Sequence, residues 1–316
     1  MSHFLQTPVP IAMLNDSAAH PPGDDPPPLG VGAETHQRRQ RLADLLPRVV
    51  SGLVLAAVAL TSVWRGGVIF ALAWLAAALA VGLEWQNLIG ASRLRLRFLI
   101  VAAALATTAY LAAHGELAAA CGILGLGGVA LALAAGPGRR LWAFGGLVYA
   151  GSLIVSVNAL YAAPGFGPRA IFWLFATVWG ADVFAYFGGR LIGGPKLWPQ
   201  VSPSKTWSGT LSGVFAGALI GALIGAVIGV QGLDGARFAA PIFALGLVAA
   251  LVSQAGDIFE SIVKRRFGAK DSSALIPGHG GFMDRLDGFV AAAAFTAVVA
   301  ALHGLPSAAP GLFDWF

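Results

Sequence analysis

The sequence predicts an all-α fold, a polytopic integral membrane bundle of about nine transmembrane helices. Hydrophobic residues make up 57% of the 316 residues and charged residues only 11%, and the mean hydropathy is +0.75. A soluble domain of this length would be far more polar. The formal net charge is +5, but the basic residues stand in short clusters between apolar runs. We therefore attribute the charge to membrane topology and expect no nucleic-acid partner.

The chain begins with a polar, proline-rich segment that shows no apolar period. Residues 1–47 are therefore expected to form a disordered cytoplasmic tail, and residues 305–316 a short C-terminal tail. The N-terminal segment lacks the apolar core and small-residue cleavage site of a signal peptide, so the first membrane helix should remain in the mature protein. The single cysteine, Cys121, lies in an apolar run and excludes an intrachain disulfide.

Between the tails, apolar runs that approach the length needed to cross a bilayer, about 20 residues each, follow one another. Nine are expected, at Val49–Trp64, Gly67–Leu88, Phe98–Ala113, Glu116–Ala135, Leu141–Ala162, Ala170–Gly188, Gly209–Val230, Phe238–Phe259 and Gly288–His303. The first, third and last are short for a span. Gly217, Gly221 and Gly225 recur every four residues in the seventh run, which predicts a close helix-packing face.

The distribution of lysine and arginine orients these runs. With a cytoplasmic N-terminus, 17 of the 20 basic residues fall on the inner side, as the positive-inside rule requires. The same orientation puts four acids toward the cytoplasmic side: Asp182, Asp257, Asp284 and Asp287. Glu84 and Asn87, at the inner end of the second run, either join these acids or are ordinary helix-end residues.

The densest charge lies between Ser253 and Gly288. Asp284 and Asp287 stand three residues apart where a helix should begin, so both carboxylates can project from one face and share a divalent cation. Mg²⁺ takes oxygen ligands and keeps waters and substrate phosphates, which suits such an open cluster, with Asp257 as a third ligand. The basic residues between them suit phosphate oxygens: Lys264, Arg265, Arg266 and Lys270. A basic run beside a membrane helix is also a common topology signal.

A second polar cluster follows the sixth apolar run. It contains Gly188, Gly189 and Arg190 and continues to Ser202-Pro-Ser-Lys205-Thr206-Trp-Ser208-Gly. Glycines and hydroxyl groups allow the backbone and side chains to approach a triphosphate closely, and Lys205 can reach a phosphate oxygen. Glycine-rich turns with a lysine are also frequent between membrane helices, so this loop alone is weak evidence.

Both clusters carry a pattern of fixed positions. The pattern reads Ser261-Ile-Val-Lys264-Arg265, then Lys270-Asp271, then Pro277-Gly-His279-Gly280-Gly281-Phe-Met-Asp284-Arg285-Leu-Asp287. It resembles the signature of the phosphatidate cytidylyltransferases, also called CDP-diacylglycerol synthases. The second cluster is similar to that family's Ser-Pro-x-Lys-Thr motif, which an aromatic residue, Glu and Gly usually follow. Ser208 stands here where Glu is usual. The resemblance covers residues 182–288, and upstream only the hydropathy is similar.

The resemblance implies that CTP and phosphatidate react to give CDP-diacylglycerol and pyrophosphate, in phospholipid biosynthesis. It implies an enzyme of the inner cell membrane with its active site at the cytoplasmic face, N-terminal transmembrane helices at residues 48–165 and a catalytic transmembrane domain at residues 166–304. We expect a groove open sideways to lipid. A homodimer is a further expectation.

The resemblance also assigns roles to individual residues. One or two Mg²⁺ ions would be held by Asp257, Asp284 and Asp287, with Asp182 as a fourth candidate. Phosphates would be bound by Lys264, Arg265, Lys270 and Arg285. The nucleotide or the lipid head group would be held by Ser202, Lys205 and Thr206. His279 either donates to phosphate or shapes the glycine-rich turn.

Other functions compete with this interpretation. A transporter or channel would use Asp182 and Asp257 as an ion path, but it leaves the basic run and the Gly-His-Gly-Gly turn unexplained. A nearer alternative is another CTP-using lipid enzyme, either a polyprenol kinase or a cytidylyltransferase for a different lipid phosphate. A kinase would transfer the γ-phosphoryl group and release CDP, whereas a cytidylyltransferase releases pyrophosphate.

Overall fold

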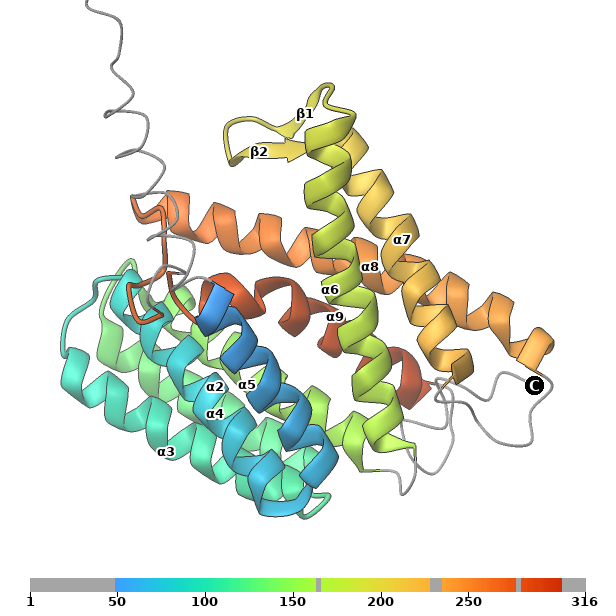
Figure 1. Ribbon diagram of the computed structural model, residues 1–316. Helices are drawn as coiled ribbons and strands as arrows, with labels where there is room; N and C mark the ends of the chain where they lie inside the picture. The colour runs from blue at the N-terminus through green and yellow to red at the C-terminus, as the bar shows by residue number, and fades with distance from the viewer. Residues whose placement is uncertain (1–48, 163–165, 228–234, 277–279, 303–316) are drawn as a thin grey trace, which may run out of the picture. The chain divides into compact units, whose positions relative to one another are not determined.

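The computed structural model describes residues 49–162, 166–227, 235–276 and 280–302. The two expected tails and His279 lie outside these ranges. Within them, eight helices are long and apolar enough to cross a membrane, which confirms the predicted all-α membrane fold (Figure 1). They are α2 (Gly67–Leu88), α3 (Leu94–Ala113), α4 (Leu117–Ala135), α5 (Arg140–Tyr161), α6 (Gly167–Leu191), α7 (Trp207–Val227), α8 (Gly235–Arg266) and α9 (Met283–Leu302). A shorter apolar helix, Val49–Arg65, precedes α2.

The structure differs most from the expected pattern at the end of α8 and in the loop after α6. Helix α8 continues past the predicted end of its apolar run at Phe259 and carries the basic run in its last turn, because Lys and Arg are good helix formers. It ends at Arg266, and Gly268 follows with a φ of +72°. The N–H of Ala269 bonds the Lys264 carbonyl at 2.9 Å there, as in a Schellman motif. The expected loop after α6 instead forms an antiparallel hairpin, β1 (Lys196–Trp198) and β2 (Ser202–Thr206).

Helices α6 and α7 run side by side below this hairpin (Figure 1). The glycines of α7 allow the approach. A Cβ on Gly217 would lie 2.5 Å from the Thr177 carbonyl oxygen, and a Cβ on Gly221 would collide with the Thr177 hydroxyl. At Gly225 the nearest atom would be 3.4 Å away, which is ordinary contact. The predicted packing face is therefore confirmed at the first two positions.

The Gly217→Ala substitution is expected to lower the free energy of unfolding by about 1–3 kcal/mol, because the new methyl group must push α6 and α7 apart. Gly225→Ala on the same helix is the matched control, since its methyl group meets only ordinary contacts. Thermal unfolding of both purified variants in one detergent measures the difference. Equal unfolding midpoints for the two variants would contradict the packing argument.

A second group of contacts fixes the end of α2. Arg97 of α3 is fully buried, and its guanidinium donates to the side-chain oxygen of Gln86 at 2.8 Å. The Gln86 amide donates in turn to the Ala143 carbonyl of α5 at 2.9 Å. The Trp85 indole N–H donates to the Trp142 carbonyl at 2.8 Å. These bonds hold α2, α3 and α5 together within two residues of Glu84.

Candidate active site

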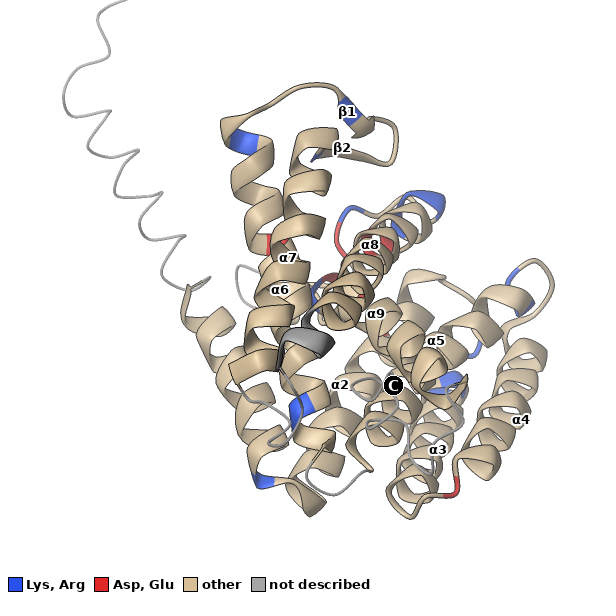
Figure 2. Cartoon of the chain, turned by 90° about the vertical axis from the view of Figure 1, so that its right-hand side faces the viewer, with Lys and Arg blue, Asp and Glu red and all other residues tan. Residues whose placement is uncertain are grey.

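A cavity of about 1440 Å³ lies among the helix Val49–Arg65, α2, α6, α8, α9 and the end of β2. Figure 2 shows acidic positions gathered where α6, α8 and α9 come together, with basic positions at the neighbouring end of α8. Eight of the twelve predicted site residues line the cavity: Asp182, Lys205, Thr206, Asp257, Lys264, Asp284, Arg285 and Asp287. Ser202, Arg265 and Lys270 are described but do not line it, and His279 lies outside the described residues.

One polar network joins three elements at the cavity. Lys205 Nζ of β2 lies 2.6 Å from an Asp257 carboxylate oxygen of α8. The same ammonium donates to the Gln254 side-chain oxygen at 3.0 Å, and the Gln254 amide donates to Asp182 of α6 at 3.3 Å. Asp287 of α9 is near enough to Asp257 and Asp182 for their charges to interact. Carboxylates from three helices therefore face one space, and they repel one another unless cations balance them.

A second network surrounds Lys264 in the last turn of α8. Its ammonium lies 2.7 Å from a Glu260 carboxylate oxygen and 2.6 Å from an Asp284 carboxylate oxygen. Glu260 is only 1% exposed, so this is a buried arrangement of two acids and one base. One ammonium between two carboxylates fixes α8 against the start of α9 and orients Lys264 at the cavity wall.

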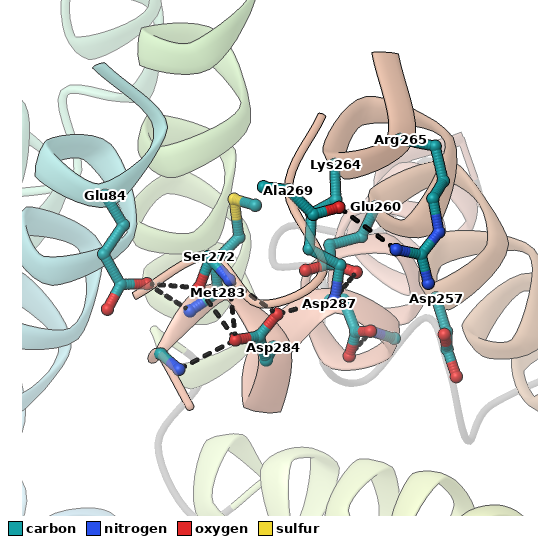
Figure 3. A network of polar contacts seen from close by, with 12 residues as sticks. Glu84, Asp257, Glu260, Lys264, Arg265, Ala269, Ser272, Met283, Asp284 and Asp287 are labelled. Atoms are coloured by element: carbon teal, nitrogen blue, oxygen red, sulfur yellow. Dashed lines mark hydrogen bonds and ion pairs between the residues drawn. The ribbon is translucent and has the colours of Figure 1, made fainter. Parts of the chain in front are cut away.

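Asp284 has several further donors. Its carboxylate accepts hydrogen bonds from the Ser272 N–H at 3.0 Å, the Ser272 hydroxyl at 2.9 Å and the Gly281 N–H at 2.7 Å (Figure 3). Together with Lys264, these donors occupy much of its acceptor capacity. A metal ion bound to Asp284 would have to displace some of them.

The donor set can be tested against the expected Mg²⁺. No group of three or more His, Cys, Asp or Glu side chains among the described residues is arranged as a ready metal site. Mg²⁺ usually binds through one or two carboxylates, waters and substrate phosphates rather than a protein cage. The carboxylates of Asp182, Asp257 and Asp287 line the same cavity and fit that manner of binding. A cation on Asp257 would share this carboxylate with Lys205 or displace it.

Apart from Lys205, the polar residues in and just after the hairpin have mainly local contacts. The Thr206 hydroxyl accepts the Gly209 N–H at 3.1 Å and so caps the start of α7, while it also lines the cavity. Ser202 is buried in β2. The Ser208 hydroxyl donates to the Gly193 carbonyl, and Ser208 does not line the cavity. Ser208, which stands where the resemblance expects Glu, thus bonds the segment before the hairpin rather than the carboxylates of the cavity.

Aromatic side chains form the wall beside the acids. The Phe289 ring lies 5.3 Å from the Trp74 ring and 5.1 Å from the Phe175 ring, and Phe175 stacks on Trp179 at 4.6 Å. All four line the cavity, together with apolar residues of the helix Val49–Arg65. The cavity is therefore amphipathic, with charge at one part of its wall and apolar surface at another.

Three residues of these networks were absent from the predicted site: Gln254, Glu260 and Ser272. Gln254 and Glu260 stand three residues on either side of Asp257 and so share its helix face. That spacing was a usable signal. Ser272 carried none, because its role depends on a loop conformation that no periodicity reveals.

Comparison with known proteins supplies the family. Residues 46–303 match the model of the cytidylyltransferase family. The chain is 39% identical over 277 residues to the phosphatidate cytidylyltransferase of Brucella abortus biovar 1 (strain 9-941), covering 87% of this chain and all of the relative. It is 36% identical over 159 residues to the Haemophilus influenzae enzyme of the same name, covering 50% of this chain and 55% of the relative. The chain therefore belongs to the cytidylyltransferase family and is a membrane-embedded nucleotidyltransferase.

Proposed function

We propose that the protein is a phosphatidate cytidylyltransferase and that the cavity is its active site. CTP and phosphatidate give CDP-diacylglycerol and pyrophosphate. The observation that carries the proposal is a single cavity whose wall combines carboxylates, basic residues and apolar surface, which suits a substrate pair made of a polar triphosphate and a membrane lipid. The names of the matched relatives support the same reaction.

The chemistry requires positioning more than proton transfer. An oxygen of the phosphatidate phosphate attacks the α-phosphorus of CTP, the new P–O bond forms, and the bond to the β-phosphate breaks to release pyrophosphate. The attacking phosphate is already anionic, so no general base is required. Lys205, Lys264 and Arg285 line the cavity and are suited to bind phosphate oxygens and to neutralise charge as it shifts toward the leaving group.

We assign the binding of Mg²⁺ to Asp257 and Asp287, with Asp182 as a further ligand. When bound, the ion would neutralise phosphate charge and orient the triphosphate. The role of Asp284 as a metal ligand stays a prediction, since its carboxylate already accepts hydrogen bonds from Lys264, Ser272 and Gly281. Its contacts support a role in holding Lys264.

The location of the site in the cell belongs to the same proposal. The basic residues follow the positive-inside rule if the N-terminus and the polar end of the cavity are cytoplasmic. CTP would then enter from the cytosol, and phosphatidate from the inner cell membrane with its acyl chains against the apolar wall. Association of two copies as a homodimer stays a prediction.

A double-label experiment tests the function. Purified protein with Mg²⁺ and phosphatidate is given CTP labelled at either the α- or the γ-phosphate. We expect the α-label in the lipid fraction as CDP-diacylglycerol and the γ-label in soluble pyrophosphate. Diacylglycerol and polyprenol, which offer hydroxyl groups, are the matched acceptors for a kinase. Entry of the γ-label into lipid would support a kinase, and folded protein that labels no lipid would refute the transferase.

A further inference from the structure

A buried carboxylate of α2 reaches across to the start of α9. Glu84 is 6% exposed, and each of its two oxygens contacts one hydroxyl and accepts one backbone N–H. One oxygen receives the Ser273 hydroxyl at 2.6 Å and the Phe282 N–H at 3.0 Å. The other accepts the Met283 N–H at 2.8 Å and lies 3.1 Å from the Ser272 hydroxyl, whose single proton it shares with Asp284. We call Glu84 and these four donor residues the Glu84 anchor. Figure 3 labels three of its members, Glu84, Ser272 and Met283.

The anchor stabilises both the start of α9 and the buried Glu84 carboxylate. The first N–H groups of a helix lack partners within the helix, and the N-terminal end of the helix dipole favours a negative charge. Glu84 supplies both acceptors and charge at the beginning of α9. Glu84 is itself the single acid of α2, where an ionised side chain is costly without partners. The four donors replace the water that the carboxylate has lost.

The anchor is connected to the cavity through a short chain of contacts. The Ser272 hydroxyl that contacts Glu84 also contacts Asp284 at 2.9 Å, and Asp284 receives Lys264 at 2.6 Å. Asp284 and Lys264 line the cavity, whereas Glu84 is not among the described residues that do. Any Cβ on Gly281 would lie within 2.7 Å of both Glu84 oxygens, so the anchor is packed too closely to shift without moving its neighbours.

We propose that Glu84 is a positioning residue of the transferase. It holds the hydroxyls of Ser272 and Ser273 before the glycine-rich turn and the backbone N–H groups at the start of α9 after it, and thereby sets Asp284 and Lys264 for the reaction. The inference rests on the proposed cytidylyl transfer and adds to it a residue from the N-terminal helices, well outside residues 182–288. Glu84 acts through Ser272 and Asp284, without touching substrate itself.

Glu84→Gln is the main test, because it keeps the shape of the side chain. Its amide NH₂ cannot accept, so the backbone N–H that faces it loses its acceptor. In the full-length protein in detergent, hydrogen exchange at one of the two amides, Phe282 or Met283, is expected to quicken by at least about tenfold. Asn87→Ala, an exposed position three residues along α2, is the matched control and should exchange as the wild type does. This readout does not depend on the reaction.

The kinetic prediction separates positioning from simple stabilisation. With rates normalised to folded protein, Glu84→Gln should lower kcat by at least about tenfold and change the KM for CTP by less than about threefold, because the bound substrates are held by other residues. Ser272→Ala keeps Glu84 and removes the hydroxyl that links it to Asp284. It should lower kcat in the same direction if Glu84→Gln does not fold.

The outcomes are distinct. Unchanged exchange in Glu84→Gln would overturn the anchor, and faster exchange with wild-type kcat would overturn its positioning role. Wild-type protein that makes no CDP-diacylglycerol would refute the proposed function and with it the kinetic role, while the exchange result would still decide whether Glu84 holds the start of α9.

Discussion

Asp287→Asn is expected to lower the rate of CDP-diacylglycerol formation by at least about a thousandfold, and Asp257→Asn by a similar factor, since each change removes a charged ligand from the proposed cation site while keeping the side-chain shape. Because Asp287 is near the Asp257 charge, Asp287→Asn should unfold at or above the wild-type temperature. Asp257→Asn also loses the 2.6 Å ion pair with Lys205, so it should unfold at or below that temperature. The measurement is the initial rate with α-labelled CTP at saturating Mg²⁺ and phosphatidate.

The control for this pair is Glu116→Gln, at the exposed start of α4 and outside the cavity lining. It removes the same charge and should retain the wild-type rate within about twofold. A folded Asp257→Asn or Asp287→Asn variant with more than about a tenth of the wild-type rate would contradict the assignment of these carboxylates.

Lys264→Met should abolish activity and also destabilise the protein by about 3–5 kcal/mol, because it leaves the buried Glu260 and Asp284 carboxylates without their shared ammonium. Arg265→Met is the matched control. Arg265 is the next residue on α8, is exposed and donates to the nearby Ala269 carbonyl. Its loss should change the unfolding midpoint little. Thermal unfolding and the labelled-CTP rate are measured on the same preparations.

A double variant separates the effect of Lys264 on stability from its effect on activity. Adding Glu260→Gln to Lys264→Met removes one of the two carboxylates left without a cation, so part of the lost stability should return. Activity should not return, because the cation at the cavity wall is still missing. Equal stability of Lys264→Met and the wild type would show that the ion pairs contribute little, and recovered activity in the double variant would contradict a role for Lys264 in binding phosphate.

The helices and the identity of most charged site residues could be predicted from the sequence, for physical reasons. Apolar runs of membrane length have few alternatives to helix, and acids such as Asp257 and Asp287 stand out because charge is rare in such runs. The hairpin at Lys196–Thr206 was missed, since a short strand pair leaves no long periodic pattern. The end of α8 was placed too early because hydropathy falls at Phe259 while the helix continues.

The contacts between segments far apart in the sequence were harder to predict. Glu84 and Ser272 are 188 residues apart in the sequence. A single sequence carries no signal that two such residues are in contact. The sequence marks Glu84 as an acid at the end of a membrane helix. Only the structure shows whether its side chain joins the site or caps a helix. In the structure it bonds the beginning of α9 and, through Ser272, contacts the Asp284 network. Gln254 was overlooked because a neutral amide carries no charge signal.

The measurement that tests the central claim most directly is binding of Mn²⁺, which favours the same oxygen ligands as Mg²⁺, to the purified protein. The ion is titrated into the wild type and into the Asp257→Asn/Asp287→Asn double variant, and free Mn²⁺ is read from its electron paramagnetic resonance signal. We predict saturable binding to the wild type and at least about tenfold weaker binding to the double variant. Equal binding by both proteins would contradict a cation site built on these two carboxylates.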